Sequence, residues 1–232
     1  MDIEGTTTPI EFVHKTLFPY ARARVRAFLE QHANDPDVRA DLRLLAAEHA
    51  AEPPQPGLPP ASGVDYVYWL MDRDRKSTAL KSLQGKIWEE GYRAGELRGR
   101  GEVYPDVATA LARWREQGRD IAIFSSGSVQ AQRNLFANTT AGDLSQFIRA
   151  YFDTTTGSKT AAQSYARIAA ALERSPSEML FLSDVSAELD AARSSGMHTA
   201  LCVRGPQTVT QTGTHPIIRT FDEVALRRAT AP

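Results

Sequence analysis

The second half of the chain alternates short apolar runs with helical stretches, and this alternation restricts the fold more than any other feature. Apolar residues at helical spacing separate the runs, as over residues 129–137 and 187–195. Consecutive parallel strands need such helical crossovers, and helices on both faces of a sheet leave its strands apolar throughout. We therefore predict an α/β fold with a parallel sheet. Its expected strands are residues 120–124, 150–153, 179–182, 199–203 and 217–218.

The first half reads as a separate helical block. Helical spacing predicts helices over residues 17–32, 37–51, 64–71 and 77–92, and the prolines of residues 52–60 predict a loop. We predict a core built from residues 1–9 and 102–232, with residues 10–101 inserted as a helical cap. Further core helices are expected over residues 106–117 and 159–173, with a last helix beginning at Asp222.

The bulk properties exclude several classes of partner. The 232 residues carry a net charge of −1, which argues against nucleic acid or an anionic membrane surface as the main partner. No apolar run of about 20 residues predicts a membrane-spanning helix, and the N-terminus does not resemble a signal peptide. Cys202 is the only cysteine, so no intrachain disulfide can form. We expect a monomer in the cytoplasm.

The N-terminal residues Asp2-Ile3-Glu4-Gly5-Thr6 have the composition of a phosphate and metal site. Extended geometry would put the Asp2 and Glu4 carboxylates on the same side of the backbone, and Gly5 would allow a sharp turn after them. Asp2 could then attack phosphorus while Glu4 transfers a proton. The alternative is an acidic, disordered tail.

Polar residues follow the later apolar runs or precede helices, where an open α/β sheet binds its ligands. Asp184 would join Asp2 as a hard oxygen ligand for Mg²⁺. Ser125 and Ser126 would offer hydroxyl and backbone donors to phosphate at a helix start, and Lys159 would supply a positive charge. The structural alternatives are a loop with a helix N-cap for the serines, an N-cap for Asp184 and a surface lysine.

Taken together, these groups resemble the haloacid dehalogenase superfamily, whose members carry an N-terminal nucleophilic Asp, a later Ser or Thr, a Lys and a final acidic metal ligand. Glu4 replaces the usual second Asp of the first motif, a variant similar to the branch of acireductone synthases, the enolase-phosphatases of methionine salvage. The likeness covers nearly the whole chain. The matching segments are Asp2-Ile3-Glu4-Gly5-Thr6-Thr7, Leu17-Phe18-Pro19-Tyr20-Ala21, Leu83-Gln84-Gly85-Lys86-Ile87-Trp88, Gly91-Tyr92, Gly95-Glu96-Leu97, Ser125-Ser126-Gly127-Ser128-Val129, Phe152-Asp153-Thr154, Gly157-Ser158-Lys159 and Phe181-Leu182-Ser183-Asp184.

The resemblance implies a Rossmann-like core and a small phosphorylated diketone as substrate. This substrate, 2,3-diketo-5-methylthiopentyl 1-phosphate, would be enolised and then dephosphorylated to an acireductone. One Mg²⁺ per chain would be held by Asp2, Glu4 and Asp184, with Glu4 binding through its carbonyl. The implied catalytic residues are Asp2, Glu4 and Lys159, and the implied substrate-binding residues are Ser125, Ser126 and Lys159.

Two further groups of residues are not assigned to the site. Trp69, Leu83, Trp88 and Tyr92 are candidates for the apolar end of the substrate pocket, or belong to the core of the helical block. The five histidines lack metal-ligand spacing, and we interpret them as structural.

One feature departs from the family. The resemblance implies a buried first strand before the nucleophile, yet only Met1 precedes Asp2. Either the start is misplaced on an internal methionine, which we favour, or the shorter chain is made and is less active. The alternatives to the implied function are another small-molecule phosphatase of the superfamily and a non-catalytic protein that binds a phosphorylated metabolite.

Overall fold

The computed structural model describes residues 1–75, 77–205 and 214–224. The chain divides into two compact units, one formed by Met1–Phe12 with Arg98–Pro232 and the other by Val13–Leu97. We call them the core unit and the helical unit. The predicted boundaries between the two units lay between residues 9 and 10 and between residues 101 and 102. The short helix α1 (Ile10–Phe12) lies in the core unit, where Phe12 is buried.

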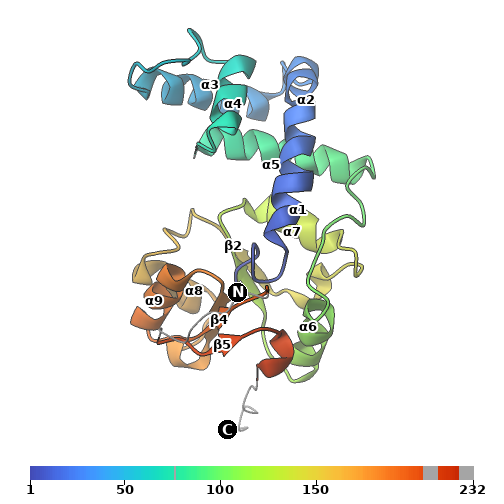
Figure 1. The fold of residues 1–232 in the computed structure, drawn as a ribbon, viewed down its shortest axis with the longest axis vertical. Coiled ribbons are helices and arrows are strands. Elements are labelled where there is room, and N and C mark those ends of the chain that lie inside the picture. Colours follow the sequence, from blue (N-terminus) through green and yellow to red (C-terminus); the bar gives the residue numbers. More distant parts are fainter. Residues whose placement is uncertain (76, 206–213, 225–232) are drawn as a thin grey trace. The chain divides into compact units, whose positions relative to one another are not determined.

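The core unit is an α/β structure in which every strand pairing is parallel, as predicted (Figure 1). Its apolar runs form strands because helices bury them. The strands are β1 (Ala122–Phe124), β2 (Ala150–Phe152), β3 (Leu180–Ser183), β4 (His198–Cys202) and β5 (Ile217–Ile218). α6 (Val107–Glu116) precedes β1, and the helices between the strands are α7 (Val129–Ala137), α8 (Ala162–Ala171) and α9 (Ser186–Ser194). Short 3₁₀ turns are η2 (Ser145–Phe147), η3 (Pro176–Glu178) and, after β5, η4 (Phe221–Glu223).

The sheet is not continuous. β1 pairs only with β2, while β3, β4 and β5 form a separate three-stranded sheet. Between β1 and β3 the chain start makes the only bridge among the described backbone hydrogen bonds. The Met1 amine donates to the Ala122 carbonyl (2.8 Å), Phe124 N–H donates to the Met1 carbonyl (2.9 Å), and Asp2 N–H donates to the Leu182 carbonyl (2.9 Å). Met1 and Asp2 thus bridge β1 and β3 by three hydrogen bonds.

Aromatic packing holds α8 against both sheets. Tyr165 of α8 lies edge-on to Phe124 of β1, with ring centroids 5.5 Å apart, and to Phe181 of β3, at 4.9 Å. Edge-to-face pairs of this kind contribute about 0.5–1.5 kcal/mol beyond their buried area. The same cluster includes Ile168 and Met197. The two halves of the sheet therefore share one apolar layer even though they share few backbone hydrogen bonds.

The helical unit contains the four predicted helices, with one addition. A π-helical turn, η1 (Val13–Leu17), leads into α2 (Phe18–Gln31), which is followed by α3 (Pro36–Ala51), α4 (Val64–Asp72) and α5 (Thr78–Arg93). Local capping explains two of the starts. The Asp35 side chain accepts from the N–H groups of Asp37 and Val38 ahead of Pro36, and Ser77 accepts from Leu80 N–H.

The four apolar candidates of the helical unit lie in or against its core. Trp69 and Leu83 belong to the buried cluster, and Tyr92 is buried as well. Trp88 is half-buried, stacks on Phe18 at 6.3 Å and donates its indole N–H to the Leu17 carbonyl. These contacts favour the interpretation that all four are core residues.

Two predicted helices of the core unit differ in the structure. α8 begins at Ala162 rather than at Lys159, because the Ser158 carbonyl accepts from Ala161 N–H and from the Ser164 hydroxyl and so closes a turn ahead of the helix. The last helix is only the 3₁₀ turn η4, and residues 225–232 lie outside the described residues. None of the described helices is long and apolar enough to cross a membrane.

Candidate active site

The site begins in a tight turn at the N-terminus. Asp2 is 4% exposed. After it, the Ile3 carbonyl accepts hydrogen bonds from the N–H groups of Thr6, Thr7 and Thr8 at 3.2, 2.8 and 2.9 Å. Gly5 makes this turn possible with a φ of +69°, a conformation that costs other residues strain. The segment is therefore ordered and buried, which excludes the alternative of a disordered tail.

The prediction that the Asp2 and Glu4 carboxylates lie on the same side of an extended backbone is wrong. Asp2 is buried, whereas Glu4 is exposed and forms an isolated bridge with Thr8. The chain already turns at Ile3, so the two-residue period of an extended strand does not reach Glu4. The two residues therefore differ in burial.

Lys159 brings together three segments that are far apart in the sequence. Its ammonium lies 2.7 Å from Asp2 Oδ1 and 2.8 Å from Glu188 Oε2, and its side chain is only 12% exposed. Burial opposes the positive charge, but the two carboxylates outweigh it and raise the pKa of Lys159. Lys159 is therefore a cation held in the protein interior, and not the surface lysine of the structural alternative.

Glu188 is a site residue that the sequence analysis missed. It lies in the first turn of α9, is buried, and accepts a hydrogen bond from the Ser183 hydroxyl at 3.0 Å. Burial and the nearby charge of Asp2 raise the pKa of Glu188. The available signal was its position one helical turn after Asp184, on the helix that follows β3.

Asp184 follows β3 and is half-buried. Burial, and after it the charge of Asp2, raises the pKa of Asp184. Its Oδ1 atom is buried and has no hydrogen-bond partner among the described residues. No group of three or more His, Cys, Asp and Glu residues in that part of the chain forms a ready metal cage. Two neighbouring carboxylates with an unsatisfied oxygen nevertheless fit a hard divalent cation that keeps several waters.

Gly5 and Asp184 are packed too closely for a side chain at position 5. A β-carbon on Gly5 would overlap the Asp184 carboxylate. We expect Gly5→Ala to displace this carboxylate, to raise the Mg²⁺ concentration for half-maximal activity at least about tenfold, and to cost more than the roughly 1 kcal/mol of backbone strain alone. Gly99→Ala is the matched control, because Gly99 has a φ of +65° and open space around it. Equal Mg²⁺ requirements in the two variants would contradict the clash.

The two predicted phosphate-binding serines are placed differently from expectation. Ser125 directly follows β1 and is buried, but its N–H donates to the Phe152 carbonyl at 3.1 Å and is therefore used by the sheet. Helix α7 begins only at Val129 and is capped by Ser128. Ser126 is exposed. In the described part of the chain no hydrogen bond or ion pair joins either serine to Lys159. Their hydroxyls, rather than a helix start, are therefore the candidate phosphate donors.

Arg204 supports the N-terminal turn, a contact that the sequence analysis did not predict. Its Nε donates to the Thr6 carbonyl at 2.9 Å, and its Nη1 pairs with Asp106 at 2.7 Å. The guanidinium stacks over the rings of Tyr104 and Phe221 at 4.6 and 4.3 Å. Nothing in the sequence pattern links position 204 to position 6, since only the fold brings them together.

The chain is similar to known proteins over most of its length. The haloacid dehalogenase-like hydrolase family model matches residues 1–196. Enolase-phosphatase E1 of Synechococcus elongatus is 51% identical over 229 residues, which cover 97% of this chain and 95% of the relative. Enolase-phosphatase E1 of Sorangium cellulosum is 47% identical, with the same coverage. The crystal structure of the UTR4 protein of Saccharomyces cerevisiae is 35% identical, with a TM-score of 0.74 over 96% of this chain and 97% of that one.

The relatives match nearly the whole chain. The residues matched by the family model include the turn at Asp2, the segment of Lys159 and the start of α9. The chain therefore belongs to the haloacid dehalogenase-like hydrolases and, within them, to the enolase-phosphatase E1 family.

Proposed function

We propose that this chain converts 2,3-diketo-5-methylthiopentyl 1-phosphate to the acireductone 1,2-dihydroxy-3-keto-5-methylthiopentene and phosphate. As an enolase-phosphatase, it is a phosphoric monoester hydrolase of methionine salvage. The observation that carries the proposed chemistry is the buried Asp2–Lys159 pair, with Glu188 behind it and Asp184 beside Asp2. The proposal includes action as a monomer in the cytoplasm, and the role of the helical unit as a cap stays a prediction.

In the proposed reaction Asp2 is the nucleophile. Its carboxylate oxygen forms a bond to phosphorus, and the bond between phosphorus and the substrate oxygen breaks with its electron pair on that oxygen. Water then attacks phosphorus, which releases phosphate and regenerates Asp2. Lys159 orients the Asp2 carboxylate and stabilises the negative charge on the phosphoryl oxygens. The Ser125 and Ser126 hydroxyls donate to the same oxygens.

Asp2, Asp184 and the Glu4 carbonyl would hold one Mg²⁺. When bound, this ion would polarise the diketone and neutralise phosphate charge. Glu4 keeps its carboxylate for proton transfer in this assignment. It takes the proton from the carbon beside the carbonyl, which gives the enolate, and the enolate oxygen takes a proton from water to give the enol. Glu4 then donates its proton to the leaving oxygen. The exposure of Glu4 suits a group that exchanges protons with water.

Glu4→Gln tests whether the Glu4 carboxylate transfers protons while the Glu4 backbone carbonyl binds Mg²⁺. We expect the turnover number to fall by about 10²–10⁴-fold, the usual contribution of a general acid or base. The Mg²⁺ concentration for half-maximal activity should change little, because the substitution keeps the backbone carbonyl. Steady-state kinetics over a Mg²⁺ series measure both quantities. A variant with an unchanged turnover number and a much weaker Mg²⁺ response would assign the carboxylate to the metal instead.

The raised pKa of Asp184 predicts a pH-dependent metal requirement. Its charged form binds the cation, and the proton competes for the same oxygen at a higher pH than at an ordinary Asp. As the pH falls through this raised pKa, the half-saturating Mg²⁺ concentration should rise, approaching about tenfold per pH unit for one displaced proton. Saturating Mg²⁺ should restore the activity lost in mild acid. A half-saturating concentration that does not change with pH would contradict this assignment.

The decisive test of the proposed function is turnover of the diketone phosphate with and without Mg²⁺. We expect loss of the diketone, appearance of the acireductone and release of one phosphate per substrate. An aryl phosphate separates the alternatives. Turnover of the aryl ester but not the diketone would indicate a different phosphatase, and binding of the diketone without release of phosphate from either compound would indicate a non-catalytic binding protein.

A further inference from the structure

The Arg204 side chain is a buried cation that no step of the proposed reaction uses. It lies just after β4 and is only 6% exposed. Its Nε atom donates to the Thr6 carbonyl at 2.9 Å, and its Nη1 atom pairs with Asp106 at 2.7 Å. A buried ion pair is seldom more stabilising than apolar residues of the same volume, because both charges lose their water. Stability alone therefore does not explain why an arginine occupies this position.

Asp106 binds Arg204 instead of capping its own helix. It is the N-cap residue of α6, where an aspartate usually accepts from the first N–H groups of the helix, but its side chain makes no such bond. Its Oδ2 atom accepts from Arg204 Nη1 and from Phe221 N–H, the latter at 2.5 Å. The helix thus lacks a common capping interaction, while Arg204 has a fixed partner.

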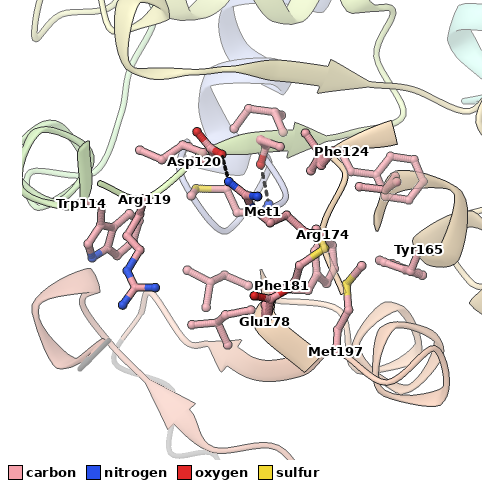
Figure 2. Close-up of a pocket in the computed structure, with 18 of the residues that line it drawn as sticks. Met1, Trp114, Arg119, Asp120, Phe124, Tyr165, Arg174, Glu178, Phe181 and Met197 are labelled. Carbon is pink, nitrogen blue, oxygen red and sulfur yellow. Dashed lines mark hydrogen bonds and ion pairs between the residues drawn. The ribbon is translucent and has the colours of Figure 1, made fainter. Parts of the chain in front are cut away.

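Two aromatic rings fix the plane of the Arg204 guanidinium. Its carbon lies 4.6 Å from the ring centroid of Tyr104 and 4.3 Å from that of Phe221. Phe221 packs in turn against Trp114 of α6, with ring centroids 5.3 Å apart. Figure 2 shows Trp114, which lines a cavity of about 310 Å³ in the core unit. A lysine could replace the charge of Arg204, but neither its planar fork nor its stacking.

Arg204 and Tyr104 together hold two successive carbonyls of the N-terminal turn. Arg204 binds the Thr6 carbonyl, and Tyr104 N–H donates to the Thr7 carbonyl at 3.0 Å. Since the Tyr104 ring also stacks on Arg204, the two contacts depend on each other. The N–H groups of Thr6 and Thr7 both donate to the Ile3 carbonyl. Both backbone groups of each threonine are therefore hydrogen-bonded.

This turn also touches the proposed metal site. Gly5, one residue before Thr6, lies against the Asp184 carboxylate, where an added β-carbon would come within 2.2 Å of Oδ2. The Glu4 carbonyl belongs to the peptide group that joins Glu4 to Gly5. A shift of Thr6 would therefore displace the Glu4 carbonyl and press Gly5 against Asp184. Mg²⁺ tolerates little deviation from octahedral geometry, so the position of this turn matters for a magnesium site.

We propose that Arg204 is a positioning residue of the metal site. It holds the N-terminal turn so that the Glu4 carbonyl and the Asp184 carboxylate keep the spacing that one Mg²⁺ requires. This inference rests on the proposed function for the identity of the two ligands. Asp2 is held separately by Lys159, at 2.7 Å. Loss of Arg204 should therefore weaken metal binding and leave the Asp2–Lys159 pair in place.

Arg204→Lys tests this role in the protein without substrate. We expect the dissociation constant for Mg²⁺, measured by titration calorimetry, to rise by about 10–100-fold, as is usual when a group that orients metal ligands is changed. In the metal-free protein, the amides of Thr6, Thr7 and Thr8 should exchange with solvent at least about tenfold faster, because the turn loses the group that holds it.

Arg113→Lys is the matched control. Arg113 pairs with Asp222 at 2.7 Å and donates to the Phe221 carbonyl at 3.1 Å, and these bonds lead to η4 rather than to the N-terminal turn. Mg²⁺ affinity and exchange should stay within about twofold of the unchanged protein. Asp106→Asn is the second variant, in case Arg204→Lys does not unfold cooperatively. It keeps the side-chain size and an acceptor oxygen, and should raise both quantities at least about threefold.

Equal Mg²⁺ affinities in the Arg204 and Arg113 variants would overturn the proposal. So would faster exchange in the turn with unchanged Mg²⁺ affinity, since that result describes an arginine with a purely structural role. An unchanged protein that binds no Mg²⁺ would overturn it as well. Failure of the unchanged protein to release phosphate from the diketone would count against the proposed function alone, because neither measurement here uses the substrate.

Discussion

Asp2→Asn should reduce phosphate release by at least about 10⁴-fold, because an amide cannot form the bond to phosphorus that the carboxylate forms. Asparagine keeps the size of the side chain and the backbone bond from Asp2 N–H to the Leu182 carbonyl. Lys159 also keeps its second partner, Glu188. We therefore expect a folded protein that still binds the substrate. Release of phosphate under saturating Mg²⁺ and binding of the diketone phosphate are the two measurements.

The control for this substitution is Asp37→Asn on the helical unit. Asp37 is exposed, so removal of its charge should leave turnover within about twofold, as is usual for surface substitutions. Full activity of Asp2→Asn would exclude Asp2 as the nucleophile. Loss of activity together with loss of cooperative unfolding would instead show that the substitution disrupted the fold, and circular dichroism of the variant separates the two outcomes.

Lys159→Met should damage stability and activity together. Methionine replaces the length of the side chain, but it leaves the Asp2 and Glu188 carboxylates buried without their shared cation. Removing one partner of a buried ion pair costs about 3–5 kcal/mol. For a chain of this size that corresponds to a fall in melting temperature of the order of 10 °C. Phosphate release should fall by at least about 10²-fold, because Asp2 loses the group that orients it.

A double variant separates the two effects. Adding Glu188→Gln to Lys159→Met removes one of the two uncompensated charges, so part of the lost melting temperature should return while activity stays low. Lys15→Met, at an exposed lysine, is the control and should change neither quantity. If Lys159→Met melts like the unchanged protein, the ammonium is not holding the two carboxylates together. If activity returns in the double variant, Lys159 has no role beyond balancing charge.

The arrangement of the core could be predicted because it depends on local patterns. Apolar runs such as residues 179–182 and 199–203 can only be buried strands when helices separate them, and parallel strands bring their carboxyl ends to one edge. That rule placed Asp184 at this edge, and the resemblance to the family brought in Asp2. Lys159 was placed by the likeness of its motif to the family, and the structure confirms that it contacts Asp2.

The parts that could not be predicted depend on contacts between distant segments. Glu188 reaches Lys159 only because α9 turns its first residues inward, and Arg204 reaches the Thr6 carbonyl from 198 positions away. The error at Glu4 has a different cause. Alternation along a strand holds only while the chain stays extended, and the turn at Ile3 is set by three hydrogen bonds to one carbonyl.

The division of the sheet also has a mechanical consequence for the site. Ser125 follows a strand of one sheet, whereas Asp184 follows a strand of the other. Among the described backbone hydrogen bonds, only those of Met1 and Asp2 join these halves at their centre. Small shearing movements between the two sheets would change the distance between the proposed phosphate-binding hydroxyl of Ser125 and the Asp184 carboxylate. The rigidity of this contact between the two sheets therefore determines how precisely the enzyme positions the ester it cleaves.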